Sequence, residues 1–137
     1  MKAIKLFIGI FMISLLATAC STTGIRLPEK YNLDNELTEA KEITGFRIDS
    51  WESIDFQSLI IRTIGKDYYL LVLQRPATQL PSSETIGTTL SMERLRTGFD
   101  HVIVADSTGS ESYIIQKMYK FKDREEALKF KEILKKG

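Results

Sequence analysis

The single cysteine of the chain, Cys20, stands directly behind a short apolar run. The residues before a thiol decide whether it reacts, pairs or serves as an attachment point. Lys2 and Lys5 give the chain a positive start. Residues 6–16 are then almost wholly apolar, and residues 17–19 are small. This order is typical of a bacterial secretory signal, and the apolar run is shorter than the roughly 20 residues that span a bilayer.

A cysteine directly after small residues resembles the lipobox of bacterial lipoproteins. The usual lipobox has Leu, Val or Ile three places before the cysteine, whereas here Ala17 stands there and Leu16 one place earlier. We expect residues 1–19 to be removed and Cys20 to carry a covalent lipid as an anchor in the bacterial cell envelope. Ser21, where aspartate would retain a lipoprotein at the inner membrane, favours the outer membrane, facing the periplasm. A plain secreted protein with a free thiol and a retained membrane anchor are the alternatives.

Three acids, Asp49, Glu52 and Asp55, surround Trp51 in the sequence. Paired carboxylates beside an aromatic platform are typical of glycosidases and sugar-binding sites. The same pattern arises wherever one face of a strand is wet, and aromatic side chains at strand positions usually belong to the core. The candidate ligand face is therefore Trp51, Tyr68, Asp49 and Glu52, and a hydrolytic site that uses the three acids is the alternative.

The single histidine, His101, has no nucleophile in a recognisable motif and no second metal-ligating histidine near it. We expect it to be structural or on the surface, and we expect no cofactor apart from the lipid on Cys20. The formal charge of +1 becomes −1 without Lys2 and Lys5, so nothing favours nucleic acid as a partner.

The remaining chain predicts one β-rich domain, residues 32–137, behind a polar tether of residues 20–31. Apolar residues at i, i+4 and i+7 predict a short helix over residues 32–42. Asp123, followed three residues later by Glu126, predicts the start of a C-terminal helix. β-branched and aromatic runs predict strands at residues 46–54, 59–64, 68–73, 84–90, 99–105 and 113–121.

The fold class that follows is α+β: a small, strongly curved antiparallel sheet or barrel-like domain of five or six strands, with a short N-terminal and a C-terminal helix. The runs 59–64 and 68–73 flank a three-residue connection with glycine, which predicts a β-hairpin.

Several short motifs in order resemble an uncharacterised family of small bacterial envelope proteins, DUF6491. They are "DSWE" (49–52), "LIIRT" (59–63), "YYLLVLQRP" (68–76), "TIG" (85–87) and "RTGFDHVIV" (96–104). The likeness covers about residues 33–121, and it implies a fold and a location but brings no activity.

Members of that family usually carry a cysteine just after the proline and another at the start of the last strand. Here Ala77 and Tyr113 stand at those places. Their joint absence is what the resemblance implies if the two cysteines pair as a disulfide in the oxidising envelope. The stretch 76–81 should then lie next to the start of the strand at residues 113–121.

These observations favour a non-enzymatic binding or structural module that is held at the membrane by Cys20. Other envelope proteins are its candidate partners, met at a sheet edge or at the Trp51/Tyr68 face, and the oligomeric state stays open. A pocket with two of the three acids would favour the sugar-binding or hydrolytic alternative. A lipid-carrying domain would need a large apolar cavity.

Overall fold

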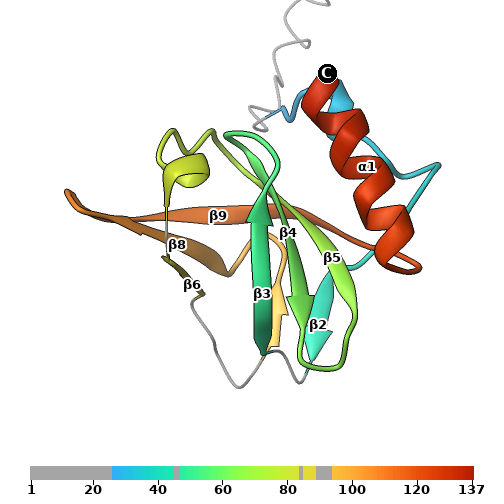
Figure 1. Cartoon of the computed structure of the whole chain (residues 1–137), viewed down its shortest axis with the longest axis horizontal. Helices are drawn as coiled ribbons and strands as arrows, with labels where there is room; N and C mark the ends of the chain where they lie inside the picture. The colour runs from blue at the N-terminus through green and yellow to red at the C-terminus, as the bar shows by residue number, and fades with distance from the viewer. Residues whose placement is uncertain (1–25, 45–46, 84, 89–93) are drawn as a thin grey trace, which may run out of the picture.

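The computed structural model describes residues 26–44, 47–83, 85–88 and 94–137 (Figure 1). Cys20 and the leader lie outside the described residues. The strands are β1 (Thr38–Glu39), β2 (Glu42–Thr44), β3 (Ile48–Ser53), β4 (Ser58–Thr63), β5 (Tyr68–Leu73), β6 (Thr85–Thr88), β7 (Arg94–Arg96), β8 (His101–Asp106) and β9 (Gly109–Lys120). The helix α1 spans Arg124–Lys136, and 3₁₀ turns occupy Glu29–Tyr31 and Leu80–Ser82.

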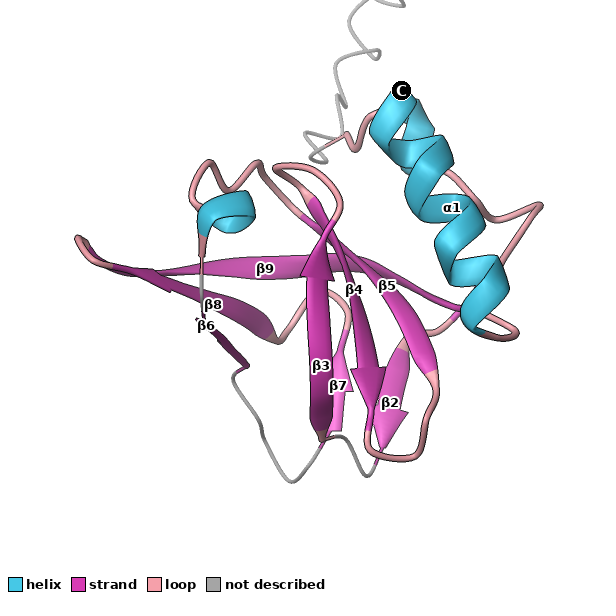
Figure 2. Ribbon diagram, in the orientation of Figure 1, coloured by secondary structure: helices cyan, strands magenta, loops and turns pink. Residues whose placement is uncertain are grey.

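The main sheet is a curled antiparallel half-barrel with the strand order β3-β4-β5-β9-β8-β6. β1 also pairs with β9, and β2 and β7 form a separate two-stranded sheet. The helix α1 lies across one face of the main sheet (Figure 2). The predicted class, a strongly curved antiparallel sheet with a C-terminal helix, is confirmed. The predicted hairpin of β4 and β5 is confirmed as well.

The central strands are buried on both faces, which explains their unbroken apolar sequences. Leu59, Ile61 and Leu71 point into the cluster on the side of the sheet away from α1. Ile60 and Leu70, their neighbours in sequence, point into a second cluster between the sheet and α1. Since successive strand residues face opposite sides, a strand with a core on each side must be apolar at every position.

The helix α1 begins as its sequence predicts. The Asp123 carboxylate accepts a hydrogen bond from the Glu126 backbone N–H at 2.9 Å, and the Glu126 side chain accepts one from the Lys122 N–H at 3.1 Å. These two bonds satisfy backbone donors that the first helical turn leaves without a partner. Phe130 and Leu134 are buried against the sheet.

The predicted helix over residues 32–42 is wrong. Leu33 and Leu37 are both buried, but the segment makes a single turn in which the Leu37 N–H bonds the Leu33 carbonyl at 2.8 Å. The chain then becomes extended, and the Ala40 N–H bonds the Met118 carbonyl of β9 at 2.9 Å. The residues after Leu37 therefore form hydrogen bonds with β9 instead of continuing as a helix.

The fold also begins earlier than residue 32. Tyr31 is 2% exposed and belongs to the cluster beneath α1, and Leu27 packs against that cluster. The folded domain thus includes residues that the sequence assigned to the tether, and it leaves a shorter connection back to Cys20.

The hairpin between β4 and β5 turns through Ile64, Gly65, Lys66 and Asp67. The left-handed position belongs to Lys66, with φ 65°, and not to Gly65. A side chain in this conformation brings its Cβ close to the backbone, at a cost of roughly 1 kcal/mol.

We predict that Lys66→Gly raises the free energy of unfolding by about 0.5–1 kcal/mol, because glycine adopts this conformation without the Cβ clash. Gly65→Ala is the matched comparison: the nearest atom to a Cβ at Gly65 is 3.7 Å away, so alanine fits there and should be neutral or stabilising by up to about 1 kcal/mol. Urea unfolding of the unlipidated Cys20→Ser chain measures both. A destabilising Gly65→Ala, or a Lys66→Gly that does not stabilise, would contradict the assignment of the left-handed residue.

Candidate functional site

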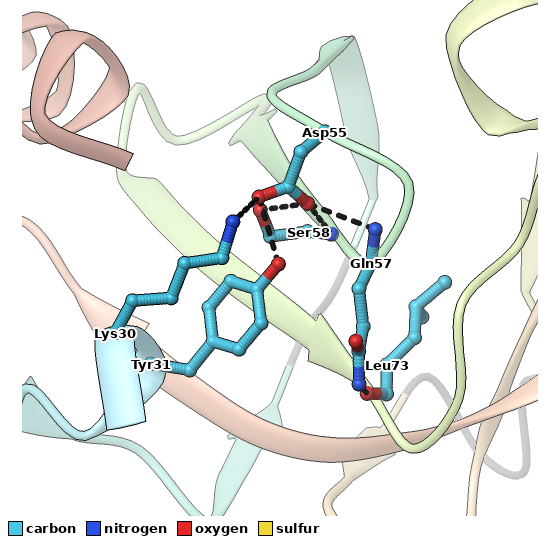
Figure 3. Close-up of polar contacts among 6 residues, drawn as sticks. All are labelled: Lys30, Tyr31, Asp55, Gln57, Ser58 and Leu73. Carbon is cyan, nitrogen blue, oxygen red and sulfur yellow. Dashed lines mark hydrogen bonds and ion pairs between the residues drawn. The ribbon is translucent and has the colours of Figure 1, made fainter. Parts of the chain in front are cut away.

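The turn between β3 and β4 holds a carboxylate, Asp55, that accepts five hydrogen bonds (Figure 3). Its Oδ2 accepts from Lys30 Nζ at 2.9 Å and from the Tyr31 hydroxyl at 2.7 Å. Its Oδ1 accepts from the backbone N–H groups of Gln57 and Ser58, both at 2.8 Å, and from the Ser58 hydroxyl at 2.9 Å. Asp55 therefore uses both of its oxygens to join the N-terminal 3₁₀ turn to the sheet.

The charge state of Asp55 follows from these contacts. Burial alone would raise its pKa, but the hydrogen bonds from Lys30, Tyr31 and the turn outweigh burial and hold the pKa of Asp55 below its usual range. Burial, together with the Asp55 acceptor, raises the pKa of Tyr31. At neutral pH the pair is a carboxylate that faces a neutral phenol.

A second polar cluster on β9 holds the next residues of the same segment. The Tyr119 hydroxyl accepts a bond from the Leu33 N–H at 3.1 Å and donates to the Asp34 carboxylate at 2.8 Å. Lys117 Nζ lies 3.2 Å from that hydroxyl and pairs with Asp34 at 3.1 Å. The hydrogen bond from Tyr119, followed by the one from Lys117, lowers the pKa of Asp34.

A groove of about 540 Å³ separates the first turns of α1 from β3, β4 and the start of β5. We call it the α1 groove; it is lined by Ser50, Glu52, Ile60, Arg62, Tyr68, Arg124, Ala127 and Leu128. The Arg62 guanidinium lies 6.0 Å from the centre of the Tyr68 ring. Glu52 forms an ion pair with Lys131 across to α1. The groove therefore offers cationic donors, one carboxylate and an aromatic surface.

The structure brings two residues of the candidate ligand face, Glu52 and Tyr68, into the lining of the α1 groove. Asp49 is an ion-pair partner of Arg62, at 3.2 Å. Trp51 is half-buried, and it packs against the cluster on the other side of the sheet while also bordering a smaller cavity of about 210 Å³ beside the groove. Three of the four, Trp51, Glu52 and Tyr68, border this smaller cavity together, and Asp49 is joined to its lining through Arg62.

The three acids of the hydrolytic alternative each pair with a different cation: Asp49 with Arg62, Glu52 with Lys131 and Asp55 with Lys30. Of the three, only Glu52 lines the α1 groove. General acid–base cleavage of a glycoside needs two carboxyl groups that flank one bond. Each of the three acids therefore contributes an ion pair to the fold, and no two of them line the α1 groove.

Sequence reasoning did not connect the cations at the groove: Arg62 and Arg124 line it, and Lys131 pairs with Glu52 of the lining. Arg62 lies inside an apolar strand sequence, where a lone charge indicates a wet position on that face. Arg124 and Lys131 are seven residues apart on α1, a spacing that places them on one side of a helix. Only the tertiary structure shows that this side of α1 faces the groove that Arg62 also lines.

Two other expectations concern His101 and Cys20. His101 begins β8 opposite Ile114 of β9 and is half-buried. Cys20 lies outside the described residues. Among the residues that the structure does describe, no cluster of three metal-ligating side chains occurs, and no helix is long and apolar enough to cross a membrane.

The positions where the DUF6491 resemblance implies paired cysteines come together in the fold. Ala77 is 0% and Tyr113 2% exposed, and both belong to the same buried cluster. Arg75 lies 4.2 Å from the Tyr113 ring centre and pairs with Glu111 at 2.9 Å. The stretch after Pro76 thus packs beside β9, as the resemblance implies.

Comparison with known proteins gives one match. The model of a family described as "Family of unknown function (DUF6491)" matches residues 2–134. No curated protein and no solved structure matches.

We predict that Asp55→Asn lowers the free energy of unfolding at neutral pH by about 2–3 kcal/mol, because Lys30 and Tyr31 lose a charged, part-buried acceptor. A carboxyl with a lowered folded pKa contributes stability above its unfolded value of about 3.9, and this contribution is lost as the pH falls through the folded value. The difference between wild type and Asp55→Asn should therefore shrink below about pH 4.

Denaturant unfolding at a series of pH values measures this difference. The control is Asp49→Asn, which removes an exposed ion pair and should cost less than about 1 kcal/mol. Equal losses for the two variants, or a difference that does not depend on pH, would contradict the role of Asp55.

Proposed function

This chain belongs to the DUF6491 family, a family of unknown function, and on that basis we propose that it is a membrane-anchored bacterial envelope lipoprotein. In this proposal Cys20 carries the covalent lipid, and residues 26–137 act as a non-enzymatic binding or structural module. The module faces the periplasm from the outer membrane.

The observation that carries the proposal is the short distance along the chain between Cys20 and the fold. Leu27 already packs against the buried cluster beneath α1, and Tyr31 is clamped by Asp55. The six residue-to-residue steps from Cys20 to Arg26 reach at most about 20 Å when fully extended. A lipid on Cys20 would therefore hold the domain directly at the membrane surface.

The leader sequence supports the same proposal. Its charged start, apolar run and small residues before Cys20 are those of an exported chain. The family match begins at residue 2, so it includes the leader. Ser21 supports the outer membrane as the destination.

The α1 groove and the neighbouring edge strand support a binding role. β3 ends the strand order of the main sheet, and among the described residues no strand pairs with its outer side. Its exposed residues Ser50 and Glu52 line the groove next to Arg62 and Arg124. An extended segment of another envelope protein can add to such an edge, with its side chains in the groove.

We predict that the wild-type chain, expressed from its own leader in a bacterial host, begins at Cys20, carries acyl chains and fractionates with membranes. Cys20→Ser should be unacylated and released from membranes, while Ser21→Ala, the control, should stay attached. Intact mass and fractionation measure both properties. An unacylated, soluble wild-type chain would refute the anchor.

The binding role predicts a contact at the groove. A photo-crosslinking residue at Ser50 should give a defined adduct with another envelope protein in the native host, and Arg124→Glu should reduce it. The same residue at Thr108, exposed in the turn between β8 and β9, is the control. Identical adducts from both positions, or none from Ser50, would contradict a partner at the groove.

A further inference from the structure

One end of the domain gathers the residues closest to the proposed anchor. Lys30 pairs with Asp55 at 2.9 Å, which places the described N-terminal segment beside the turn that bears Phe56. Gly137, after the last turn of α1, lies against the side chain of Lys30. Figure 1 shows the C-terminal end of α1 next to the start of the described chain. We call this region, made of residues 26–30, Phe56 and residues 133–137, the anchor end.

The anchor end presents an aromatic ring on a fixed turn. Phe56 is 55% exposed, although its carbonyl accepts a 2.6 Å bond from the Ala77 N–H and its neighbour Asp55 is held by five bonds. Ile133, on the exposed side of the last turns of α1, is 46% exposed. The hydrogen-bonded backbone of the turn therefore keeps the Phe56 ring exposed to solvent. Apolar surface is left unburied at this end.

This end also carries exposed charges. Arg26, Lys135 and Lys136 are exposed, as are two acids, Glu29 and, directly before Ile133, Glu132. Lys30 is neutralised by Asp55. An exposed aromatic ring beside an excess of lysine and arginine is suited to the interface of a bilayer with anionic headgroups.

We propose that the anchor end rests on an anionic phospholipid surface, with Phe56 at the level of the headgroups. This inference rests on the proposed function, because a lipid on Cys20 keeps the anchor end within about 20 Å of the bilayer. A short tether raises the effective concentration of the bilayer surface at the anchor end. Even a weak contact between the two is then formed for much of the time.

The docked orientation leaves the α1 groove accessible. The groove is lined by Arg124, Ala127 and Leu128, which belong to the first turns of α1, whereas Lys135 and Lys136 end the helix. Thirteen helical residues separate the two ends by about 20 Å. The membrane therefore contacts one end of α1, and a partner can reach the other.

The structure offers a matched pair of reporter positions. Phe56 and Ile64 lie in the turns before and after β4, at opposite ends of that strand, and are 55% and 60% exposed. Acylation of Cys20 blocks the single native thiol, so Phe56→Cys or Ile64→Cys each introduces one site for a spin label. Both variants replace an exposed side chain and should fold.

The test uses the full chain expressed with its own leader, purified from membranes and reconstituted in vesicles of phosphatidylethanolamine and phosphatidylglycerol. The label at position 56 should be several-fold less accessible to a water-soluble nickel relaxant than the label at position 64. Lys135→Glu with Lys136→Glu, or vesicles of phosphatidylcholine alone, should remove most of this difference.

Intact mass of the same samples separates the two possible failures. An acylated chain with equal accessibility at positions 56 and 64 would overturn the docking and leave the proposed anchor standing. An unacylated wild-type chain would overturn the proposed function and, with it, the docking.

Discussion

The arrangement of this domain depends on the hydrogen bonds that the part-buried carboxylate of Asp55 accepts. A charge that is largely removed from water is stable only when its oxygens are satisfied, and Asp55 meets this need with donors from two distant parts of the chain. Two of the donors, Lys30 and Tyr31, belong to the segment that leads back to Cys20. The same bonds that satisfy the carboxylate therefore fasten that segment to the sheet.

This fastening completes a core that the sheet alone would leave open. β4 and β5 carry apolar residues on both faces, so each face needs a cover. The curled sheet closes over one face, while α1 and the segment of Tyr31, Leu33 and Leu37 cover the other. The Tyr119 hydroxyl meets the backbone N–H of Leu33 at the centre of this cover. The N-terminal segment is thus part of the core, and a force applied at the anchor would reach the sheet directly.

Local sequence patterns predicted helices and strands correctly where a local property, such as strand burial or helix capping, determines the secondary structure. The apolar run of β5 and the Asp123/Glu126 pair at the start of α1 match the structure because strand burial and helix capping are local properties. The spacing of Leu33 and Leu37 suggested a helix, yet one turn is enough to bury both side chains, and β9 then binds the following backbone. β2 and β7 were missed because each is short and pairs with a strand far away in the sequence.

The candidate site shows the same division. The sequence drew attention to Glu52 and Tyr68, which do line the α1 groove; it grouped Asp55 with Asp49 and Glu52 as acids of a hydrolytic alternative, whereas in the structure Asp55 binds Lys30 and Tyr31. The partners of Asp55, Lys30 and Tyr31, are 25 and 24 residues away, and no short-range pattern connects them.

Amide hydrogen exchange at Leu33 tests most directly whether the anchor-proximal segment belongs to the core. Its N–H donates to Tyr119, so we expect it to exchange only when the whole domain unfolds, at a rate close to that of Leu71 in β5. Exchange at Leu33 as fast as in an exposed loop, with Leu71 still protected, would show that the segment opens independently and would contradict this account.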